Sequence, residues 1–504
     1  MTRPINYPSA PSAGGTGLAR NMGLLGLAAT GICSMLGAAI NVVPMMIQRN
    51  VPGIGPYVLQ AYVFAAIPAF LAALAYAILS SAMPPAGGSY VYGSRGLNPY
   101  LGFVASFSQW FGLSIAIGVV SYLLIPFLRD IAVALDWQPL ASKLDTGHVR
   151  VGLALVFLWT FVGVNMRGIQ LYERTLVPLM FLMFALGAVV IVAGFTFDHQ
   201  DFAAALMARE GRAIPEVPSA PFRIGPYLAA AALLFSSFIG FDSIAQAGGE
   251  ARNPGRSLPL AICIAVVTVG SFYMLFTAAM YHAVPWQYVA EQAQTQDLTA
   301  PGLLGYLLPP AWTVAIVAGA AVALINDLPA MLLAVSRLMF AWAEDGIFPK
   351  SVARVHPEWN TPTVALVLSG LMASLAIFGS HIAGDFFLGV DVLVTSMLVN
   401  FLVMCLAVLA LPRRNPEIAR AVHVVRSRSV QVPLAAAGAI MLAGFLGVHV
   451  WKDLTAQVGA WYFHSTFIWL AVMAISTVIY IRELRKLRGR GVDVDTLFST
   501  LPPE

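Results

Sequence analysis

Apolar segments recur along almost the whole chain, and short polar connections separate them. Most are close to or longer than the roughly 20 residues that an α-helix needs to cross the hydrocarbon core of a bilayer. We therefore expect about twelve transmembrane helices. The expected spans are 22–48, 57–80, 98–128, 150–166, 174–195, 226–246, 259–282, 311–342, 362–380, 387–411, 432–451 and 463–481. This pattern predicts an all-α polytopic membrane protein.

The first of these segments contains a stretch that weakens it as a helix. Residues 31–44 read G-I-C-S-M-L-G-A-A-I-N-V-V-P, with two glycines, a serine, an asparagine and a proline within an apolar run. Lipid offers no partners for free backbone groups, so a break at mid-membrane needs cover from protein, water or a ligand. Such breaks mark substrate sites in transporters. Small residues that let a neighbouring helix pack closely are an equally valid interpretation of this stretch alone.

The sixth segment is interrupted in a similar way, around residues 236–243. Five helices separate the starts of the first and sixth segments, and an odd number places the two in opposite orientations across the membrane. Paired interrupted helices in corresponding positions of two inverted halves indicate a transporter site. The sequence therefore favours an internal inverted repeat.

Composition and charge agree with a multi-pass membrane protein. Hydrophobic residues make up 59% of the 504 residues and charged residues only 10%, with a mean hydropathy of +0.79. With both termini on one side, that side carries 20 of the 28 Lys and Arg residues, which predicts cytoplasmic termini and a location in the cytoplasmic membrane. Three isolated cysteines and eight histidines without an H-E-x-x-H spacing suggest neither a disulfide framework nor a zinc site. We expect no nucleic-acid partner.

Four sequence stretches together resemble the amino acid–polyamine–organocation (APC) transporter family. The first is M-L-G-A-A-I at 35–40, and the second is M-P-P-A-G-G-S-Y-V-Y at 83–92. The third is G-F-D-S at 240–243, which runs into G-E-A-R-N-P-G-R-S-L-P at 249–259. The fourth is S-R-L-M-F-A-W-A-E-D-G at 336–346, followed by R-V-H-P at 354–357. The resemblance covers about residues 21–412, and the order of the four stretches makes it specific.

The resemblance implies a fold of two inverted five-helix repeats with broken first and sixth helices, plus two additional helices. The implied organisation is a disordered cytoplasmic tail at 1–20, a first repeat at 21–196, a second repeat at 225–411, helices 11 and 12 at 432–482, and a basic cytoplasmic tail at 483–504.

The resemblance also implies a substrate site at the two breaks. In such transporters backbone amides of the first break meet the substrate carboxylate, and carbonyls of the sixth break meet its amine. Helix N-termini carry partial positive charge and C-termini partial negative charge, so a zwitterion fits between them. The residues implied to bind substrate are Ser34, Met35, Gly37, Ala38 and Ala39 in the first segment and Phe235, Ser236, Phe238 and Gly240 in the sixth.

Three positions depart from the family pattern. Ala39 replaces a glycine that is frequent in the family, and Asn41 stands where an aromatic residue is common. Some proton-coupled members have a lysine in the fifth helix, where this chain has Met183 and no lysine at all between residues 176 and 195. That device for proton coupling is therefore absent from the sequence.

Asp242, Asp327 and Asp391 lie within apolar segments, where an ionisable side chain costs at least a few kcal/mol and needs a reason. Asp242 either braces the broken sixth helix or takes part in ion coupling. We hypothesise that Asp327 faces the interior near the first break and binds a cation or carries a proton. A structural hydrogen bond and contact with a cationic substrate are the alternatives. We assign no role to Asp391.

Other polar side chains have two interpretations each. Gln109, Trp110 and Tyr122 in the third segment either line the pathway or make contacts between helices. The loop at 250–256 either makes cytoplasmic ion pairs that stabilise one state of the transport cycle or has a purely positional role.

The sequence predicts a secondary active transporter that moves an amino acid or related amine by alternating access, without a resident cofactor and coupled to Na⁺ or H⁺. The alternatives are a carrier or exchanger of polyamines or other organic cations, and an amino acid sensor that does not transport. A membrane-embedded enzyme would need a nucleophile–base pair or metal ligands at membrane depth, and the sequence suggests no such set. The transported side chain, the coupling ion and the oligomeric state stay open at this point.

Overall fold

The computed structural model describes residues 18–37, 39–216, 221–296, 298–383 and 387–502. Its regular elements are helices, and the described residues contain one isolated β-bridge, between Met22 and Ala251, but no strand. The α-helices are α1 (Leu24–Met35), α2 (Ala39–Asn50), α3 (Val58–Ala82), α4 (Gly88–Gly96), α5 (Pro99–Ala134), α6 (Gln138–Leu144), α7 (Gly147–Met166), α8 (Ile169–Thr196), α9 (His199–Glu210), α10 (Ile224–Leu234), α11 (Asp242–Gln246), α12 (Pro254–Ala283), α13 (Trp286–Gln292), α14 (Ala300–Leu304), α15 (Pro310–Glu344), α16 (Thr363–Ala383), α17 (Phe387–Arg414), α18 (Pro416–Ala421), α19 (Arg428–Thr455), α20 (Ser465–Gly489) and α21 (Val494–Leu497). The short 3₁₀ helix η2 (Phe235–Phe238) continues α10.

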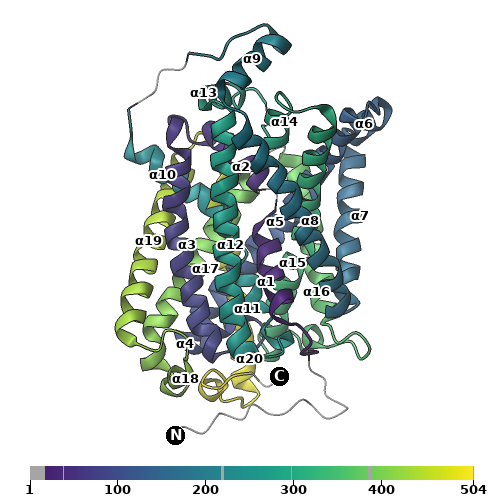
Figure 1. Ribbon diagram of the computed structural model, residues 1–504. Coiled ribbons are helices and arrows are strands. Elements are labelled where there is room, and N and C mark those ends of the chain that lie inside the picture. The colour runs from purple at the N-terminus through teal and green to yellow at the C-terminus, as the bar shows by residue number, and fades with distance from the viewer. Residues whose placement is uncertain (1–17, 38, 217–220, 297, 384–386, 503–504) are drawn as a thin grey trace.

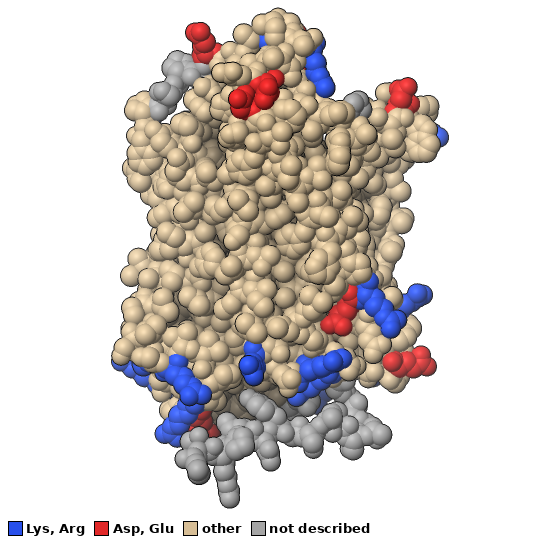
Figure 2. Space-filling model, in the orientation of Figure 1, with Lys and Arg blue, Asp and Glu red and all other residues tan. Residues whose placement is uncertain are grey.

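The structure confirms an all-α polytopic membrane protein. Within the described residues, 11 helical segments are long and apolar enough to span a membrane, and Ile224–Phe238 is a shorter apolar helix that belongs to the interrupted sixth segment. The helices stand roughly parallel in one bundle (Figure 1). In the same view, Lys, Arg, Asp and Glu side chains lie at the two ends, and the band between them shows almost none (Figure 2). A belt without charges is what the hydrocarbon core of a bilayer requires.

The first membrane segment lies at the centre of the bundle. All of its most apolar 18-residue window is buried inside the protein, whereas only 17% of the corresponding window of α20 and 28% of that of α8 are buried. The outer helices present their remaining apolar side chains to lipid. A helix that is surrounded by protein along its whole length can be interrupted, because neighbouring helices are available to cover its free backbone groups.

Both predicted interruptions are present. α1 ends at Met35 and α2 begins at Ala39, while Ala38 lies outside the described residues. In the sixth segment η2 ends at Phe238, Ile239 is extended, and Gly240 has a φ of +134° before α11 begins. α1 lies below α2 in Figure 1, and α10 lies above α11, so the two interrupted segments run in opposite directions. We call the end of the bundle where α1 begins and α20 ends the terminal face, and the opposite end the loop face.

Most ends of the spans differ from the sequence expectation by a few residues. The largest differences are at the end of the last segment, where α20 continues past residue 481 to Gly489, and at the end of the third segment. We expected its end near residue 128, but α5 continues to Ala134. Arg129 lies in this last part of α5. Its guanidinium donates hydrogen bonds to Asp130 and, at 2.8 Å, to Asp145. Hydropathy reports the part of a helix that faces lipid, whereas the helix itself continues for as long as its backbone bonds are satisfied.

The chain after α20 folds back onto the terminal face. Asp493 caps α21 through its side chain, and the following residues reach a buried arginine, Arg95, on α4. The Arg95 Nε donates to the carbonyl of Thr500 at 3.0 Å. Residues 483–489 of the predicted basic tail continue α20, and residues 503–504 lie outside the described part of the chain. Of the predicted tail at 1–20, only residues 18–20 are described, and Leu18 is buried there.

Candidate substrate-binding site

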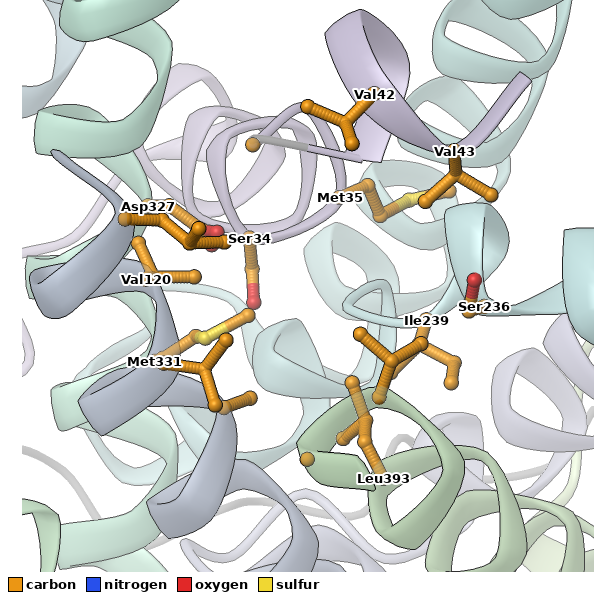
Figure 3. Close-up of a pocket in the computed structure, with 16 residues that line it drawn as sticks. Ser34, Met35, Val42, Val43, Val120, Ser236, Ile239, Asp327, Met331 and Leu393 are labelled. Atoms are coloured by element: carbon orange, nitrogen blue, oxygen red, sulfur yellow. The ribbon is translucent and has the colours of Figure 1, made fainter. Parts of the chain in front are cut away.

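A cavity lies between the two interrupted segments in the middle of the bundle. Figure 3 shows Asp327 and Ser236 on opposite sides of this cavity. Residues from α1, α2, α5, the sixth-segment break, α15 and α17 line it. They are Ser34, Met35, Gly37, Val42, Val43, Ala116, Val119, Val120, Leu123, Ser236, Ile239, Asp327, Met331, Gly389, Val390 and Leu393. Mid-membrane cavities at discontinuous helices are where secondary transporters hold substrate.

Five of the sequence-predicted site residues reach this cavity. Ser34, Met35 and Gly37 come from the first break, Ser236 from the sixth, and Asp327 from α15. They are separated by up to 293 positions in the sequence. Residues of both breaks therefore line one cavity. The binding of a substrate to them stays a prediction.

At the first break, neighbouring helices cover the free backbone groups. The hydroxyl of Tyr273, on α12, donates to the Met35 carbonyl at 2.8 Å. Asn326, on α15, donates from Nδ2 to Cys33 Sγ at 2.9 Å. These bonds hold the end of α1 in place, as a break in a membrane helix requires.

Gly37 lies directly against the Asp327 carboxylate. A Cβ atom at residue 37 would overlap the carboxylate oxygen Oδ2, so a larger residue here would displace the carboxylate from this position. Gly37 thus has a specific physical reason to be glycine, and the same contact brings Asp327 to the first break.

The sixth break packs against the first. Gly240 adopts a φ of +134°, and a Cβ atom at this position would overlap the Ser34 carbonyl group. The hydroxyls of Ser34 and Ser243 are hydrogen-bonded at 3.0 Å. Both the positive φ and the close approach favour glycine. The two breaks therefore form one continuous structural unit.

Asp242 lies beside this unit rather than in the cavity. Its carboxylate accepts a bond from the Gly240 backbone N–H at 3.1 Å and another from the Gln109 side-chain amide. Gln246 also donates to Gln109 Oε1. This arrangement braces the sixth break, and the coupling role that we considered for Asp242 stays a prediction without a cavity contact to support it.

Asp327 differs from Asp242 in having an incomplete set of partners. It is 3% exposed, and within the described residues its Oδ1 has no hydrogen-bond partner. On the opposite side of the cavity, the buried hydroxyl of Ser236 likewise has no hydrogen-bond partner among the described residues. Buried polar atoms are almost always bonded, so unpartnered ones facing a cavity are candidates for contact with a ligand.

Most of the cavity wall is aliphatic, and sequence reasoning missed these residues. On α5 the lining positions are Ala116, Val119, Val120 and Leu123, spaced as one face of a helix. That spacing was visible in the sequence, but a helix face that packs against another helix has the same pattern. Only the arrangement of the helices shows that this face lines a cavity instead of packing against another helix.

Several predicted residues lie elsewhere. The side chain of Phe238 packs against Tyr62, with ring centroids 5.6 Å apart, and Phe235 packs on Phe401. Neither side chain lines the cavity. Ala38 lies outside the described residues, as does the side chain of Ala39.

The polar residues considered for the third segment make contacts between helices. Gln109 bonds to Asp242, the Trp110 ring lies 5.9 Å from that of Trp342 on α15, and the Tyr122 hydroxyl is 2.9 Å from His381 Nδ1. None of the three lines the cavity, so the structure supports the packing interpretation for this set.

Asp391 faces a second, more polar hollow at the loop face. It shares this hollow with Arg49, His449, Lys452 and Asp453. The His449 Nε2 lies 3.1 Å from the Asp391 carbonyl oxygen. Asp391 therefore belongs to the outer end of the bundle and not to the cavity between the breaks.

Between the cavity and the terminal face, a buried ion pair joins α15 to the segment that follows α11. Arg337 pairs with Glu250, and each side chain is only 1% exposed. The Glu250 carbonyl also accepts from the Met22 backbone N–H at 2.8 Å, which ties in the start of the first segment. The ion pairing considered for the 250–256 loop is thus present for Glu250.

No cluster of metal ligands occurs in the described part of the chain: no three or more His, Cys, Asp or Glu side chains are grouped so that they could hold a metal ion.

Taken together, these observations define a polytopic helical membrane protein with a cavity between two broken helices. The amino acid permease family model matches residues 22–479, and the chain belongs to this family, within the APC superfamily. Its members are permeases and not enzymes.

Individual relatives extend over most of the chain at low identity. The branched-chain amino acid permease BcaP of Bacillus subtilis is 26% identical over 95% of this chain and 96% of its own length. The methylthioribose transporter of the same organism is also 26% identical, over 95% of this chain and 97% of its own. The low-affinity putrescine importer PlaP of Escherichia coli is 25% identical, over 68% of this chain and 70% of its own. The names of these relatives cover amino acids, an amine and a thiosugar.

Proposed function

We propose that this protein is a secondary active transporter that moves an amino acid across the cytoplasmic membrane by alternating access. The observation that carries the proposal is the cavity between the two interrupted segments, which reaches Ser34 and Gly37 on one side and Ser236 on the other. Rocking of the broken-helix bundle against the remaining helices would expose this cavity first to one side and then to the other.

The free helix ends at the cavity suit a zwitterion. The start of α2 offers backbone amides with partial positive charge, and the end of α10 and η2 offers carbonyls with partial negative charge. We propose that residues 34–39 meet the substrate carboxylate and residues 235–240 its amine, as the family resemblance implies.

The aliphatic wall favours an aliphatic substrate side chain. Val42, Val120, Ile239, Val390 and Leu393 present methyl groups to the cavity, and burial of a matching side chain stabilises the complex by about 0.8 kcal/mol per CH₂. The relative named as a branched-chain amino acid permease supports the same substrate class.

A carrier of organic cations is the second candidate, because one observation favours it. Asp327 is a carboxylate within the cavity, and no Lys, Arg or His is among the described residues that line it. An amine without a carboxylate could pair with Asp327 directly. The relative named as a putrescine importer supports this alternative.

We propose Asp327 as the residue that couples transport to a cation or a proton. A carboxylate at membrane depth requires compensation of its charge, and this one has no ion-pair partner among the described residues. The asymmetric distribution of Lys and Arg supports cytoplasmic termini, so the terminal face would be the cytoplasmic face.

Uptake into proteoliposomes tests the proposal. The purified protein is supplied with labelled leucine, other amino acids, putrescine and aliphatic monoamines, under imposed Na⁺ and H⁺ gradients separately. We expect accumulation of aliphatic amino acids and exchange of labelled for unlabelled substrate. Binding without accumulation or exchange would indicate a sensor, and preferential uptake of amines would support the organic cation carrier.

A further inference from the structure

The position of Asp327 places a carboxylate of the protein at the break that is proposed to hold the carboxylate of the substrate. Its oxygen Oδ2 touches the Cα of Gly37 so closely that a Cβ there would overlap it. Gly37 lies between the last residue of α1 and the first of α2, and both Gly37 and Asp327 line the cavity. A substrate carboxylate at this break would therefore lie next to Asp327.

The surroundings of Asp327 offer it no positive charge. Two titratable groups that interact with it electrostatically are the Cys33 thiol on α1 and the Tyr273 phenol on α12, and both are neutral at physiological pH. Both also have other partners, because Asn326 donates to Cys33 and Tyr273 donates to the Met35 carbonyl.

In the described part of the chain, the other helices around the cavity present no unpaired charged side chain to Asp327. α5 presents Ala116, Val119 and Val120 to the cavity, and α17 presents Gly389, Val390 and Leu393. The buried side chains of α8 have one titratable group, Tyr172, and its hydroxyl is bonded to Thr30 at 2.9 Å. The nearest arginine along α15, Arg337, is paired with Glu250.

Two carboxylates that share a site of low polarity do not both ionise, because each disfavours the charge of the other; one proton held between them removes the repulsion. We infer that Asp327 and the carboxylate of a bound amino acid form such a pair, so that the amino acid and one proton bind together. This inference rests on the proposed function and specifies its coupling ion.

The proton balance of the cycle follows from this pair. A proton from the outer solution binds to the Asp327 carboxylate, and the resulting O–H donates a hydrogen bond to the substrate carboxylate. When the cavity opens to the cytoplasm, the amino acid leaves and the proton passes from Asp327 to water. One zwitterion and one proton enter in each cycle, so each cycle carries one positive charge inward. Na⁺ takes no part.

An amine that lacks the carboxylate should behave in the opposite way. Its ammonium group pairs best with ionised Asp327, so protonation of Asp327 competes with its binding. Leucine binding should therefore strengthen as pH falls, by up to about tenfold per pH unit for one linked proton, whereas binding of 3-methylbutylamine, which is leucine without its carboxylate, should weaken.

The test compares binding of these two probes to the purified full-length protein from mildly acidic to mildly alkaline pH, together with proteoliposome transport. In Asp327→Asn we expect leucine binding that no longer depends on pH, leucine exchange that persists, and loss of the accumulation driven by a proton gradient. Binding of 3-methylbutylamine should weaken at least tenfold. Asp130→Asn is the matched control, since Asp130 is a partly exposed carboxylate near the loop-face end of α5, outside the cavity and paired with Arg129. This variant should keep the wild-type pH dependence.

Three results would overturn the inference: wild-type leucine binding that is independent of pH or strengthens as pH rises, a folded Asp327→Asn protein that keeps the wild-type pH dependence, or leucine uptake driven by Na⁺ alone. If Asp327→Asn does not fold, proton flux in the wild type decides, because added leucine should carry one proton inward per molecule. Failure of the proposed function is a different outcome, in which no amino acid or amine of the panel is transported at all. If the panel selects another amino acid, that amino acid and its decarboxylated amine replace the two probes.

Discussion

The guanidinium of Arg95 and the carboxylate of Asp345 form a two-point salt bridge, at 2.5 and 2.8 Å, that is almost completely shielded from solvent. Arg95 belongs to α4 and Asp345 directly follows α15, so the pair joins two elements 250 positions apart at the terminal face. The ring of Phe498 lies 5.1 Å from the guanidinium and covers it. The C-terminal segment therefore completes this buried site.

Removal of one partner of this pair should destabilise the protein strongly. In Asp345→Ala the Arg95 charge stays buried without its partner, and such changes cost about 3 to 5 kcal/mol. The measurement is the free energy of unfolding, or the midpoint of thermal unfolding, of the purified protein in detergent. Arg212→Ala is the matched control, because Arg212 forms exposed pairs with Glu210 and Glu291 and its loss should change stability by less than about 1 kcal/mol. Equal effects of the two substitutions would contradict the structural role of the buried pair.

Alanine at Gly240 should disrupt the junction between the two breaks. The residue has a φ of +134° and its Cα faces the Ser34 carbonyl, so Gly240→Ala introduces both backbone strain and overlap. We expect a loss of stability of about 1 to 3 kcal/mol and at least a tenfold loss of uptake. Gly444→Ala on α19 is the control, since a Cβ there would meet nothing within 4 Å and alanine favours the helix. Uptake that survives Gly240→Ala unchanged would argue against close contact of the breaks during transport.

Narrowing the cavity should change which substrates are accepted. Val120 lines the cavity from α5, and Val120→Phe fills space that a bulky aliphatic side chain would need. We expect KM for leucine to rise about tenfold, which corresponds to 1.4 kcal/mol, while a smaller substrate such as alanine is affected less. Val156→Phe, at an exposed position of α7, serves as the control for the added ring. An equal relative rise of KM for leucine and for alanine would indicate general damage to the protein instead of altered selectivity.

The Glu250–Arg337 pair should hold the terminal face closed. Glu250→Gln leaves the Arg337 charge buried without compensation, which disfavours the closed arrangement. Cys33 lies near the cavity at the end of α1 and can report opening after Cys263→Ala and Cys405→Ala remove the other thiols. We expect a polar maleimide to modify Cys33 several times faster in the Glu250→Gln background. Glu210→Gln at the loop face should leave the rate of Cys33 modification unchanged. Equal rates in the Glu250→Gln and Glu210→Gln backgrounds would contradict the closing role.

Much of the fold could be predicted because membrane helices are encoded locally. The length and hydropathy of each segment predict the spans, and the interruption at residues 236–243 marks the sixth break. The bonds of Asp242 to Gln109 and Gly240 could not be predicted, because they depend on how α5 packs against the broken segment. The same holds for Tyr122, because the sequence left open whether it lines the pathway or contacts another helix, and the structure shows its contact with His381.

The sequence by itself determined that the protein crosses the membrane about twelve times, that its first and sixth segments are interrupted, and that Asp327 lies at membrane depth. Only the tertiary structure decided that Asp327 touches Gly37, that an aliphatic wall from α5 and α17 surrounds both breaks, and that the C-terminal segment covers Arg95. The physical reason is that hydropathy and helix breaking act over a few neighbouring residues. A cavity and its unpaired carboxylate arise from side chains on several helices, whose relative rotations no single segment encodes.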